Sequence, residues 1–494
     1  MKLKIRDMDL TTGDSLVAIM HKDDASMLDL HPLDRVKIKK GRKLATVIID
    51  IGASSKSIKR GIVGVFDEVV EELNLKDGEW VEVIPARKPL SLEYIKKKLE
   101  GHKLIKEEID QIVWDIVHNK LSSIELTYFV SACYANELDV EETMLLTKAM
   151  TDHGQKLKLN KYPVLDKHCI GGVAGNRTTP IVVSIVAAAG FAIPKTSSRS
   201  ITSPAGTADT MEVLTPVSLS LKKMKQVVEK TNGCFVWGGA LDLAPADDKI
   251  IRVERPLSID AKSQLLASVM AKKASVSATH LLIDIPCGKG SKIESTKKAK
   301  DLKKDFEGLS KKLGIKVRVV LTDGTQPIGN GIGPALEARD ILYVLTNDSK
   351  APKDLRSKSV KLAGLMLSLA GKKNGTKAAL KLLSSGAAHR KFLEIIKAQG
   401  GSEMQPDMIA TGSLTHDIKT GSSGIIKSVS NEVISKIARI AGAPENKKAG
   451  VYLYKHVGDK VKKGELVYTI YSDASLKMQQ AVAITKKMCG VLIQ

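Results

Sequence analysis

Aromatic residues are scarce in this chain of 494 residues, since Phe, Trp and Tyr together make up 4% of it. Cysteine is scarce as well, and the five cysteines form no CxxC pair: Cys133, Cys169, Cys234, Cys287 and Cys489. This spacing indicates neither a zinc site nor a disulfide framework, so we expect no metal. No apolar run is long enough to cross a membrane, and the first residues, MKLKIRDMDL, lack the apolar core of a signal peptide. We therefore expect a cytoplasmic protein that makes no membrane contact.

Acidic residues are outnumbered by basic ones, 55 against 77, which gives a formal net charge of +22 at pH 7. A basic balance of this size is compatible with nucleic-acid binding. However, the lysines are spread along the chain without the interleaved aromatic residues on which bases stack, as in Lys222-Lys223 and Lys297-Lys298. We therefore expect no nucleic-acid partner and interpret the lysines mostly as solvated helix surface that also attracts anionic substrates. Nucleic-acid binding stays the alternative from another functional class.

The length of the chain favours several domains. The first 86 residues alternate short apolar runs with Gly, Asp and Lys turns. These runs predict strands at 36–38, 45–49 and 80–84 and a helix over 67–73. This small β-rich domain carries no group of reactive residues, so we interpret it as an assembly module. The segment Pro85-Ala86-Arg87-Lys88-Pro89 indicates its boundary.

The hydrophobic period becomes helical after this boundary and predicts an all-helical domain over 87–162. Strand and helix signals then alternate, with strands at 281–285 and 317–321 and a helix at 335–345. This alternation predicts a large α/β domain over 163–426. A smaller α+β region follows over 427–494, so the predicted fold class is multidomain α/β.

The stretch from Lys167 to Leu214 carries the clearest signals for a binding site. It begins with the glycine-rich turn Gly171-Gly172-Val173-Ala174-Gly175 and continues as a buried helix. We expect Thr179 as the N-cap of that helix, Pro180 at its first position and Gly190 just past its end. A glycine-rich loop before a helix N-terminus suits an anion, although no Gly-Lys-Ser/Thr completes a P-loop.

The second half of the stretch repeats this arrangement. Residues 191–193 predict a short strand, which leads to five hydroxyl residues and Arg199 within Ser197 to Ser203. Another helix follows Thr207, with Asp209 and Glu212 spaced like a capping box. Such a loop would bind a phosphate and a sugar. The alternative is a polar linker with ordinary helix caps.

Three segments in order resemble the thymidine and pyrimidine nucleoside phosphorylase family. They are Lys167-His168 with Gly171-Gly172-Val173, the segment SSRSITSPAGTADTME from Ser197, and TDGTQPIGNGIGPALE from Thr322 to Glu337. The N-terminal region and the SRSITS variant are most similar to the archaeal AMP phosphorylase branch. The resemblance implies that residues 248–274 return to the helical domain, which leaves the active site in a cleft between that domain and the α/β domain. It implies cleavage of AMP by inorganic phosphate as co-substrate, with no cofactor, giving adenine and ribose 1,5-bisphosphate; CMP and UMP are further candidate substrates.

The same resemblance assigns site residues. Asp260 falls on the general-acid position, although Asp260 by itself is typical of the N-cap of the helix that follows. The substrate-binding positions fall on Gly172, Ser198, Arg199, Ser200, Ile201, Thr202, Ser203, Thr207, Ser268 and Lys292. Ser268 and Lys272 are spaced i, i+4 and share a polar helix face, which is a base-reading surface or simply a solvent face.

Departures from the bacterial pyrimidine enzymes keep a second substrate class open. Cys169 replaces a phosphate-binding serine, Ser203-Pro204 replaces a His-Thr pair, and Val253 occupies the position of the arginine that grips the pyrimidine. These changes argue against thymidine, and a pyrimidine nucleoside phosphorylase stays the alternative. The C-terminal region resembles a barrel-sandwich hybrid, but Lys477 is a poor match to a biotinyl carrier lysine. We expect a homo-oligomer, with dimers assembled further through the N-terminal domain.

Overall fold

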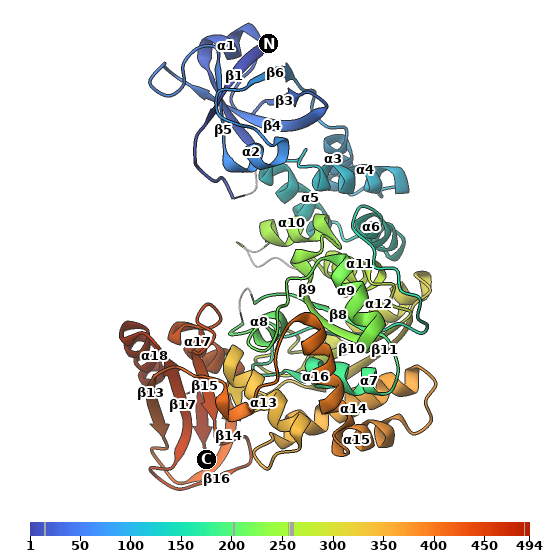
Figure 1. Ribbon diagram of the computed structural model, residues 1–494, viewed down its shortest axis with the longest axis vertical. Coiled ribbons are helices and arrows are strands. Elements are labelled where there is room, and N and C mark those ends of the chain that lie inside the picture. Colours follow the sequence, from blue (N-terminus) through green and yellow to red (C-terminus); the bar gives the residue numbers. More distant parts are fainter. Residues whose placement is uncertain (14–15, 201–202, 255, 257–260, 489) are drawn as a thin grey trace. The chain divides into compact units, whose positions relative to one another are not determined.

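The computed structural model describes residues 1–494 except 14–15, 201–202, 255, 257–260 and 489 (Figure 1). The chain divides into two compact units. The first comprises residues 1–154 and 244–268, and the second comprises residues 155–243 and 269–494. None of the helices in the described part of the chain is long and apolar enough to span a membrane.

The first unit begins with a closed β-barrel in the strand order β1-β5-β2-β4-β3-β6, which β6 closes by pairing antiparallel to β1. Alternate residues point inward, as expected for strands, so Val36 and Ile38 are fully buried while Lys37 is exposed. The predicted strands and helix are confirmed, with wider bounds for the strands. The barrel elements are β1 (Lys2–Asp7), β2 (Val17–His21), α1 (Lys22–Met27), β3 (Arg35–Lys40), β4 (Lys43–Gly52), β5 (Ile62–Val65), α2 (Asp67–Leu73) and β6 (Trp80–Pro85).

The rest of the first unit is helical, as predicted. Capping boxes start two of its helices, with Ser122 and Glu125 on α5 and Asp139 and Glu142 on α6. Glu142 also accepts hydrogen bonds from Lys98 Nζ and from the Leu104 backbone N–H, both at 2.9 Å, so a buried charge is fully compensated. The helices are α3 (Ser91–Leu99), α4 (Lys106–Val117), α5 (Ser123–Ala135), α6 (Val140–Asp152) and α10 (Pro245–Glu254).

The second unit is built on parallel strands. β10 lies between β11 and β7, and β8 pairs with β9, each pair parallel. An isolated parallel bridge between Val164 and Ala192 sets β7 beside β8. The predicted strands at 281–285 and 317–321 are confirmed within longer strands. The strand expected at 191–193 instead begins at its last residue. These strands are β7 (Leu165–Cys169), β8 (Ile193–Ser197), β9 (Gly233–Trp237), β10 (His280–Cys287) and β11 (Lys316–Asp323).

The core of the second unit forms around α7, whose residues from Thr178 to Ala187 are all buried. A helix that is apolar on every side has to be enclosed, and α14, α15 and α16 pack around it. Gly190 follows the helix with φ of +92°, as predicted for a helix end. The helices are α7 (Thr178–Ala188), α8 (Thr207–Met211), α9 (Leu221–Thr231), α12 (Thr296–Lys312), α13 (Pro334–Thr346), α14 (Lys353–Leu369), α15 (Gly375–Ser384) and α16 (Ala387–Gln399). The residues of α11 (Lys262–Ser275) are divided between the two units after Ser268.

The C-terminal part of the second unit is antiparallel. One sheet has the order β12-β15-β17-β13 and the other β16-β14-β18. Lys477 lies inside α18 rather than in a hairpin, so it does not have the setting of a biotinyl carrier lysine. The elements are β12 (Gly331–Ile332), β13 (Leu414–Lys419), β14 (Gly424–Val429), α17 (Asn431–Ala441), β15 (Gly450–Leu453), β16 (Lys460–Val461), β17 (Leu466–Ser472), α18 (Ser475–Lys487) and β18 (Val491–Ile493).

Candidate active site

The loops predicted to bind substrate follow the carboxyl ends of parallel strands in the second unit. The glycine-rich turn follows β7, the hydroxyl loop follows β8 and the segment with Lys292 follows β10, while the block from Thr322 begins with the last two residues of β11. Loops at the carboxyl ends of adjacent parallel strands gather at one edge of a sheet, where α/β proteins bind ligands.

Lys167, the middle residue of β7, is fully buried. Its Nζ donates to Thr178 Oγ1 at 3.0 Å and to Thr179 Oγ1 at 3.2 Å, in the first turn of α7. Burial lowers the pKa of Lys167, while Cys169 and the Asp284 carboxylate act in the opposite direction. Within the described residues, no carboxylate forms an ion pair with Lys167. A buried ammonium beside a helix N-terminus, with only hydroxyl partners, is a site prepared for an anion.

The start of α7 corrects the expectation for its cap. The helix begins at Thr178, and Arg177 occupies the N-cap without a side-chain capping bond. Thr179 therefore lies in the first turn, and Pro180 is the third helical residue rather than the first. The threonine hydroxyls turn toward the Lys167 ammonium instead of the helix backbone, because a buried ammonium without acceptors would lose its hydration uncompensated.

A second group of buried lysines surrounds Asp166. The Asp166 carboxylate lies 2.8 Å from Lys273 Nζ and 3.6 Å from Lys195 Nζ. Burial lowers the pKa of Lys195 to about 7, although Asp166 opposes this shift. Loss of hydration and the neighbouring lysines lower the pKa of His168 well below its usual range. The imidazole is therefore neutral at physiological pH and suited to donate or accept one hydrogen bond.

Arg199, in the hydroxyl loop, is held by acidic side chains. Its guanidinium donates to both carboxylate oxygens of Glu212, at 2.7 and 2.6 Å, and lies 3.4 Å from Asp209 Oδ1. It also lies over the Trp237 ring. The hydrogen bonds from Arg199, together with Lys447 at 2.7 Å, lower the pKa of Glu212 to about 2. In this structure, the Glu212 carboxylate therefore competes with the phosphate that we expect the Arg199 guanidinium to bind.

Asp209 and Glu212 do not form the expected capping box. Gly206 is the N-cap of α8, and Asp209 at the third helical position accepts from the Gly206 and Ser200 N–H groups, at 2.8 and 2.7 Å. Glu212 is instead the C-cap residue and pairs with Arg199. One carboxylate thus ties the loop to the helix start, while the other fixes the arginine.

The remaining hydroxyls of this loop bond mostly within it. Ser200 Oγ donates to the Ser203 carbonyl, and Ser203 Oγ donates to the Ala205 carbonyl at 3.1 Å. Thr207 Oγ1 accepts from Arg177 at 3.1 Å. The carbonyl of Ser198 lies so close to Gly206 that a Cβ there would be 2.6 Å away from it. Ile201 and Thr202 lie outside the described residues.

Gly172 and Lys292 are brought together, although 120 positions separate them in the sequence. Gly172 has φ of +86°, and a Cβ at this position would lie 2.1 Å from the Lys292 backbone nitrogen. Only glycine satisfies both the backbone conformation and this close approach. The turn after β7 and the segment after β10 therefore meet backbone to backbone at this point.

Arg177 joins the three family segments. Its guanidinium bonds to Glu337 Oε2, to Thr207 Oγ1 and, at 2.7 Å, to the Ala205 carbonyl. Glu337 is fully buried and also accepts from Thr210 at 2.8 Å. Sequence reasoning missed Arg177 as well as the charge role of Lys167. The signals that could have found them were an arginine directly before a helix start and a lysine inside a short strand that precedes glycines.

Asp340 anchors the loop of the third segment. Its Oδ2 accepts from the Asn330 and Gly331 N–H groups, both at 2.7 Å, while Oδ1 has no hydrogen-bond partner among the described residues. Burial raises the pKa of Asp340 to about 7, against the effect of these two bonds. The anchored loop meets the glycine-rich turn directly, since the Ile328 N–H donates to the Ala174 carbonyl at 3.0 Å.

We expect Asp340→Asn to stabilise the protein above pH 7. The folded-state pKa of Asp340 lies above its unfolded value, so its contribution to stability is complete below about pH 4 and is lost as the pH rises through about 7. An asparagine keeps an oxygen for the two N–H groups without the buried charge. Since each pKa unit corresponds to about 1.4 kcal/mol, the gain at pH 8 should be on the order of 2–4 kcal/mol. Denaturant unfolding at pH 5 and 8 measures it, and parallel pH profiles for both proteins would contradict an elevated pKa.

Ser268 and Lys272 lie on α11 as predicted and share its half-buried face with Leu265, whereas their neighbours Ala267 and Val269 are buried. α11 begins at Lys262, and the Ala261 carbonyl accepts the first helical hydrogen bond from the Leu265 N–H. Asp260 itself lies outside the described residues.

A metal site does not stand out among the residues that the structure places. No group of three or more His, Cys, Asp or Glu side chains in the described ranges is arranged to hold an ion. Cys169 Sγ lies 3.5 Å from Asn176 Nδ2, so the Asn176 amide donates a weak hydrogen bond to this sulfur.

Comparisons with known proteins identify the parts of the chain. Family models match in order: the glycosyl transferase family helical bundle domain over 92–154, the a/b domain of the same family over 161–389, and the pyrimidine nucleoside phosphorylase C-terminal domain over 425–491. The solved anthranilate phosphoribosyltransferase of Thermus thermophilus is similar in fold, with a TM-score of 0.53 and 18% identity over 62% of this chain and 99% of that one.

Full-length relatives give the closer relationship. The AMP phosphorylase of Thermococcus kodakarensis is 46% identical over all of this chain and 98% of its own length. Those of Methanocaldococcus jannaschii and Pyrococcus furiosus are each 45% identical, again over all of this chain and 98% of theirs. Identity of this level over the whole length, with the three family domains in order, means that the chain belongs to the AMP phosphorylase family.

Proposed function

We propose that the protein cleaves AMP with inorganic phosphate to give adenine and ribose 1,5-bisphosphate. A phosphate oxygen attacks the anomeric carbon, the C–N glycosidic bond breaks, and the base takes the bonding electrons and one proton. The full-length relatives named AMP phosphorylase support this assignment. The observation that carries it in the structure is Lys167, a buried ammonium with hydroxyl partners at the start of α7.

Inorganic phosphate is assigned to the start of α7. There the Lys167 ammonium, the Thr178 hydroxyl and the N–H groups of the first turn can all donate to one anion. A bound phosphate would also be the anionic partner that Lys167 does not have among the described residues. Since lysine, hydroxyls and a helix end carry the anionic load, the proposal requires no cofactor.

The nucleotide is assigned to the hydroxyl loop together with Gly172, Ser268 and Lys292. Ser198, Ser200, Ile201, Thr202, Ser203 and Thr207 supply the loop's binding groups. The Gly172 turn lets the backbone approach the ligand closely. We assign Asp260 as the general acid that donates a proton to the departing base. A binding role for Arg199 requires that its guanidinium reach a second anion while Glu212 still holds it.

Arg199→Ala should reduce AMP turnover much more than any residual adenosine turnover. The 5′-phosphate is remote from the breaking bond, so its binding energy can orient the anomeric carbon. Loss of one charge-assisted contact costs roughly 1.5–3 kcal/mol, or about ten- to a hundred-fold in kcat/KM. The measurement is kcat/KM for both substrates, with circular dichroism as a check of folding.

Glu212→Gln is the matched control, because it weakens the grip on the guanidinium and leaves the arginine in place. If Arg199 only braces the loop through Glu212, both variants should lose activity equally on AMP and adenosine. That pattern would remove Arg199 from recognition of the 5′-phosphate.

Product analysis tests the function as a whole. Purified protein is incubated with phosphate and a panel of nucleosides and their 5′-monophosphates, including AMP, CMP and UMP. We expect free base from AMP in the presence of phosphate and far less from adenosine. Release of base from thymidine or uridine instead would favour a pyrimidine nucleoside phosphorylase, the family whose C-terminal model also matches.

We propose the four-part division from the sequence for the whole chain: residues 1–86, 87–162 with 248–274, 163–426 and 427–494. The self-contained barrel core supports the first part, and the two antiparallel sheets support a barrel-sandwich arrangement in the last. We also propose that the protein is cytoplasmic.

We also propose a homo-oligomer that assembles through residues 1–86. Removal of this segment should leave a folded phosphorylase of lower oligomeric order, because the barrel closes on itself and holds its own core. Light scattering of the truncated and full-length proteins measures the change. An unchanged assembly size would refute the assembly role.

A further inference from the structure

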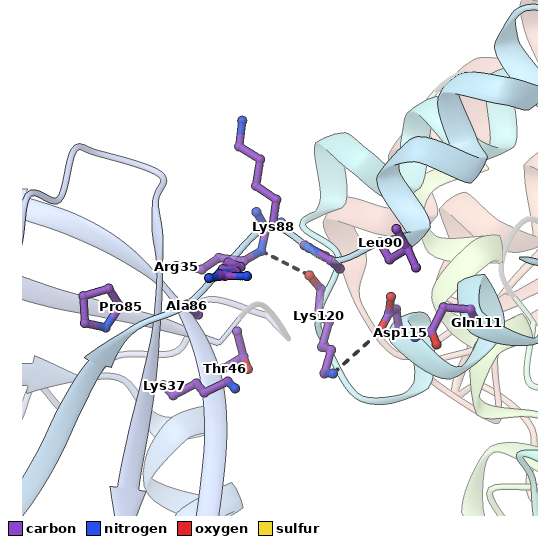
Figure 2. Close-up of a pocket in the computed structure, with 12 residues that line it drawn as sticks. Arg35, Lys37, Thr46, Pro85, Ala86, Lys88, Leu90, Gln111, Asp115 and Lys120 are labelled. Atoms are coloured by element: carbon purple, nitrogen blue, oxygen red, sulfur yellow. Dashed lines mark hydrogen bonds and ion pairs between the residues drawn. The ribbon is translucent and has the colours of Figure 1, made fainter.

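A pocket of about 450 Å³ lies between the β-barrel and the helices of the first unit. Figure 2 shows Arg35, Lys37 and Thr46 on the barrel side and Asp115 and Lys120 on the helical side. The connecting segment Pro85 to Leu90 completes the lining. None of these residues belongs to the loops assigned to AMP or phosphate, so the pocket is a separate feature.

The lining is strongly basic. It contains Arg35, Lys37, Arg87, Lys88 and Lys120 against the single carboxylate of Asp115. Arg35 is occupied, since it pairs with Glu125 and donates to the Lys120 carbonyl at 3.2 Å. Lys37, Arg87 and Lys88 are exposed at the pocket, and none of them forms an ion pair with another described residue. Three cations around one concave surface create a positive potential that favours an anion.

Asp115 is a buried carboxylate in the pocket wall that lacks a hydrogen-bond donor among the described residues. Its side chain is 1% exposed, and neither carboxylate oxygen accepts a hydrogen bond in the described structure. Lys120 Nζ, 3.7 Å from Oδ1, is shared with the Trp114 ring, whose centroid lies 3.9 Å away. A buried carboxylate without a donor costs free energy. A hydroxyl or N–H group brought by a ligand would remove that cost.

We propose that this pocket binds a small phosphorylated sugar or nucleotide as a ligand distinct from the substrate in the active site. The phosphate contacts Lys37, Arg87 and Lys88, and a sugar hydroxyl donates to Asp115. Pro85, Pro89 and Leu90 supply the apolar wall, and the volume is within the range of small-molecule sites. Inorganic phosphate provides an anionic partner for the cations only. A sugar phosphate provides that partner and also a hydroxyl donor for the Asp115 carboxylate.

Hydrogen exchange followed by mass spectrometry on the full-length protein tests this proposal, because it locates binding independently of turnover. Ribose 5-phosphate is the probe and inorganic phosphate its comparison. We expect ribose 5-phosphate to slow exchange in peptides that cover residues 85–90 and 111–120, with tighter binding than phosphate. The absence of protection in these peptides at millimolar probe would overturn the proposal.

Lys37→Ala and Lys39→Ala form a matched pair, since both lysines are exposed on β3 and only Lys37 lines the pocket. Lys37→Ala should weaken ribose 5-phosphate binding about ten-fold, the effect of one lost charge-assisted contact, while Lys39→Ala leaves it unchanged. Asp115→Asn should lower the affinity for ribose 5-phosphate to nearly the affinity for inorganic phosphate. The affinity for inorganic phosphate itself should not fall. Equal effects of the two lysine variants, or equal binding of both probes by the wild type, would also overturn the assignment.

Discussion

Lys167→Met is expected to remove most phosphorolysis while leaving the protein at least as stable as the wild type. Methionine is similar in length to lysine and apolar, so it fits a position that is fully buried. The hydroxyls of Thr178 and Thr179 lose a donor but keep their place in the first turn of α7. Without the ammonium, the proposed phosphate site loses its buried positive charge.

The two effects have opposite signs for a physical reason. The Lys167 ammonium has exchanged water for two neutral hydroxyls, which destabilises the folded state. With phosphate bound, the same charge acts where little solvent screens it. Removal of one preorganised group of this kind lowers kcat by about 10²–10³-fold. Saturating phosphate should raise the Tm of the wild type and not that of the variant.

Lys358→Met is the matched control. The Lys358 side chain is only 10% exposed, but its Nζ lies 3.3 Å from Asp284 Oδ2, so its removal leaves a buried carboxylate without its cation. Such a loss destabilises proteins by roughly 3–5 kcal/mol. We therefore expect denaturant unfolding to separate the two lysines, with Lys358→Met clearly less stable. A Lys167→Met protein with wild-type kcat/KM for phosphate would exclude Lys167 from the phosphate site.

Asp260→Asn is expected to lower kcat for AMP by about 10²-fold or more, within the range of general acid–base catalysis. The family resemblance assigns Asp260 as the general acid. In the sequence it precedes α11, whose first residue is Lys262. Asparagine has nearly the same shape and can still accept a hydrogen bond, so a purely structural role would be largely preserved. The proton for the leaving base would be lost.

A substrate whose leaving group needs no proton separates these roles. A ribose 5-phosphate with a 4-nitrophenoxy group at the anomeric carbon, which leaves as 4-nitrophenolate, should be cleaved by Asp260→Asn nearly as fast as by the wild type. The pH profile of kcat with AMP should also lose its limb at higher pH. If both substrates are impaired equally, or if AMP turnover stays within a few-fold of wild type, Asp260 is not the acid.

Local pattern was sufficient for most elements of the fold. The period-2 runs of the barrel, the helical period after Pro89 and the apolar runs at 281–285 and 317–321 all became the expected elements. Each of these signals lies within a single strand or helix, where the side-chain period reports directly on burial. The predictions failed at element ends, as at the N-terminus of α7, because Lys167 draws the hydroxyls of Thr178 and Thr179 away from capping.

The sequence by itself determined the order of the domains, the glycine-rich turn and the family, since these depend on residues close together in the chain. Only the tertiary structure decided which charges are compensated. Arg199 is held by Glu212 and Arg177 by Glu337, whereas Lys167 is left with two hydroxyls. Burial makes an ionic partner worth far more than it is in water, and which side chains become buried together is set by the packing of distant segments. That packing places a bare ammonium at the start of α7, where the proposed reaction needs its phosphate.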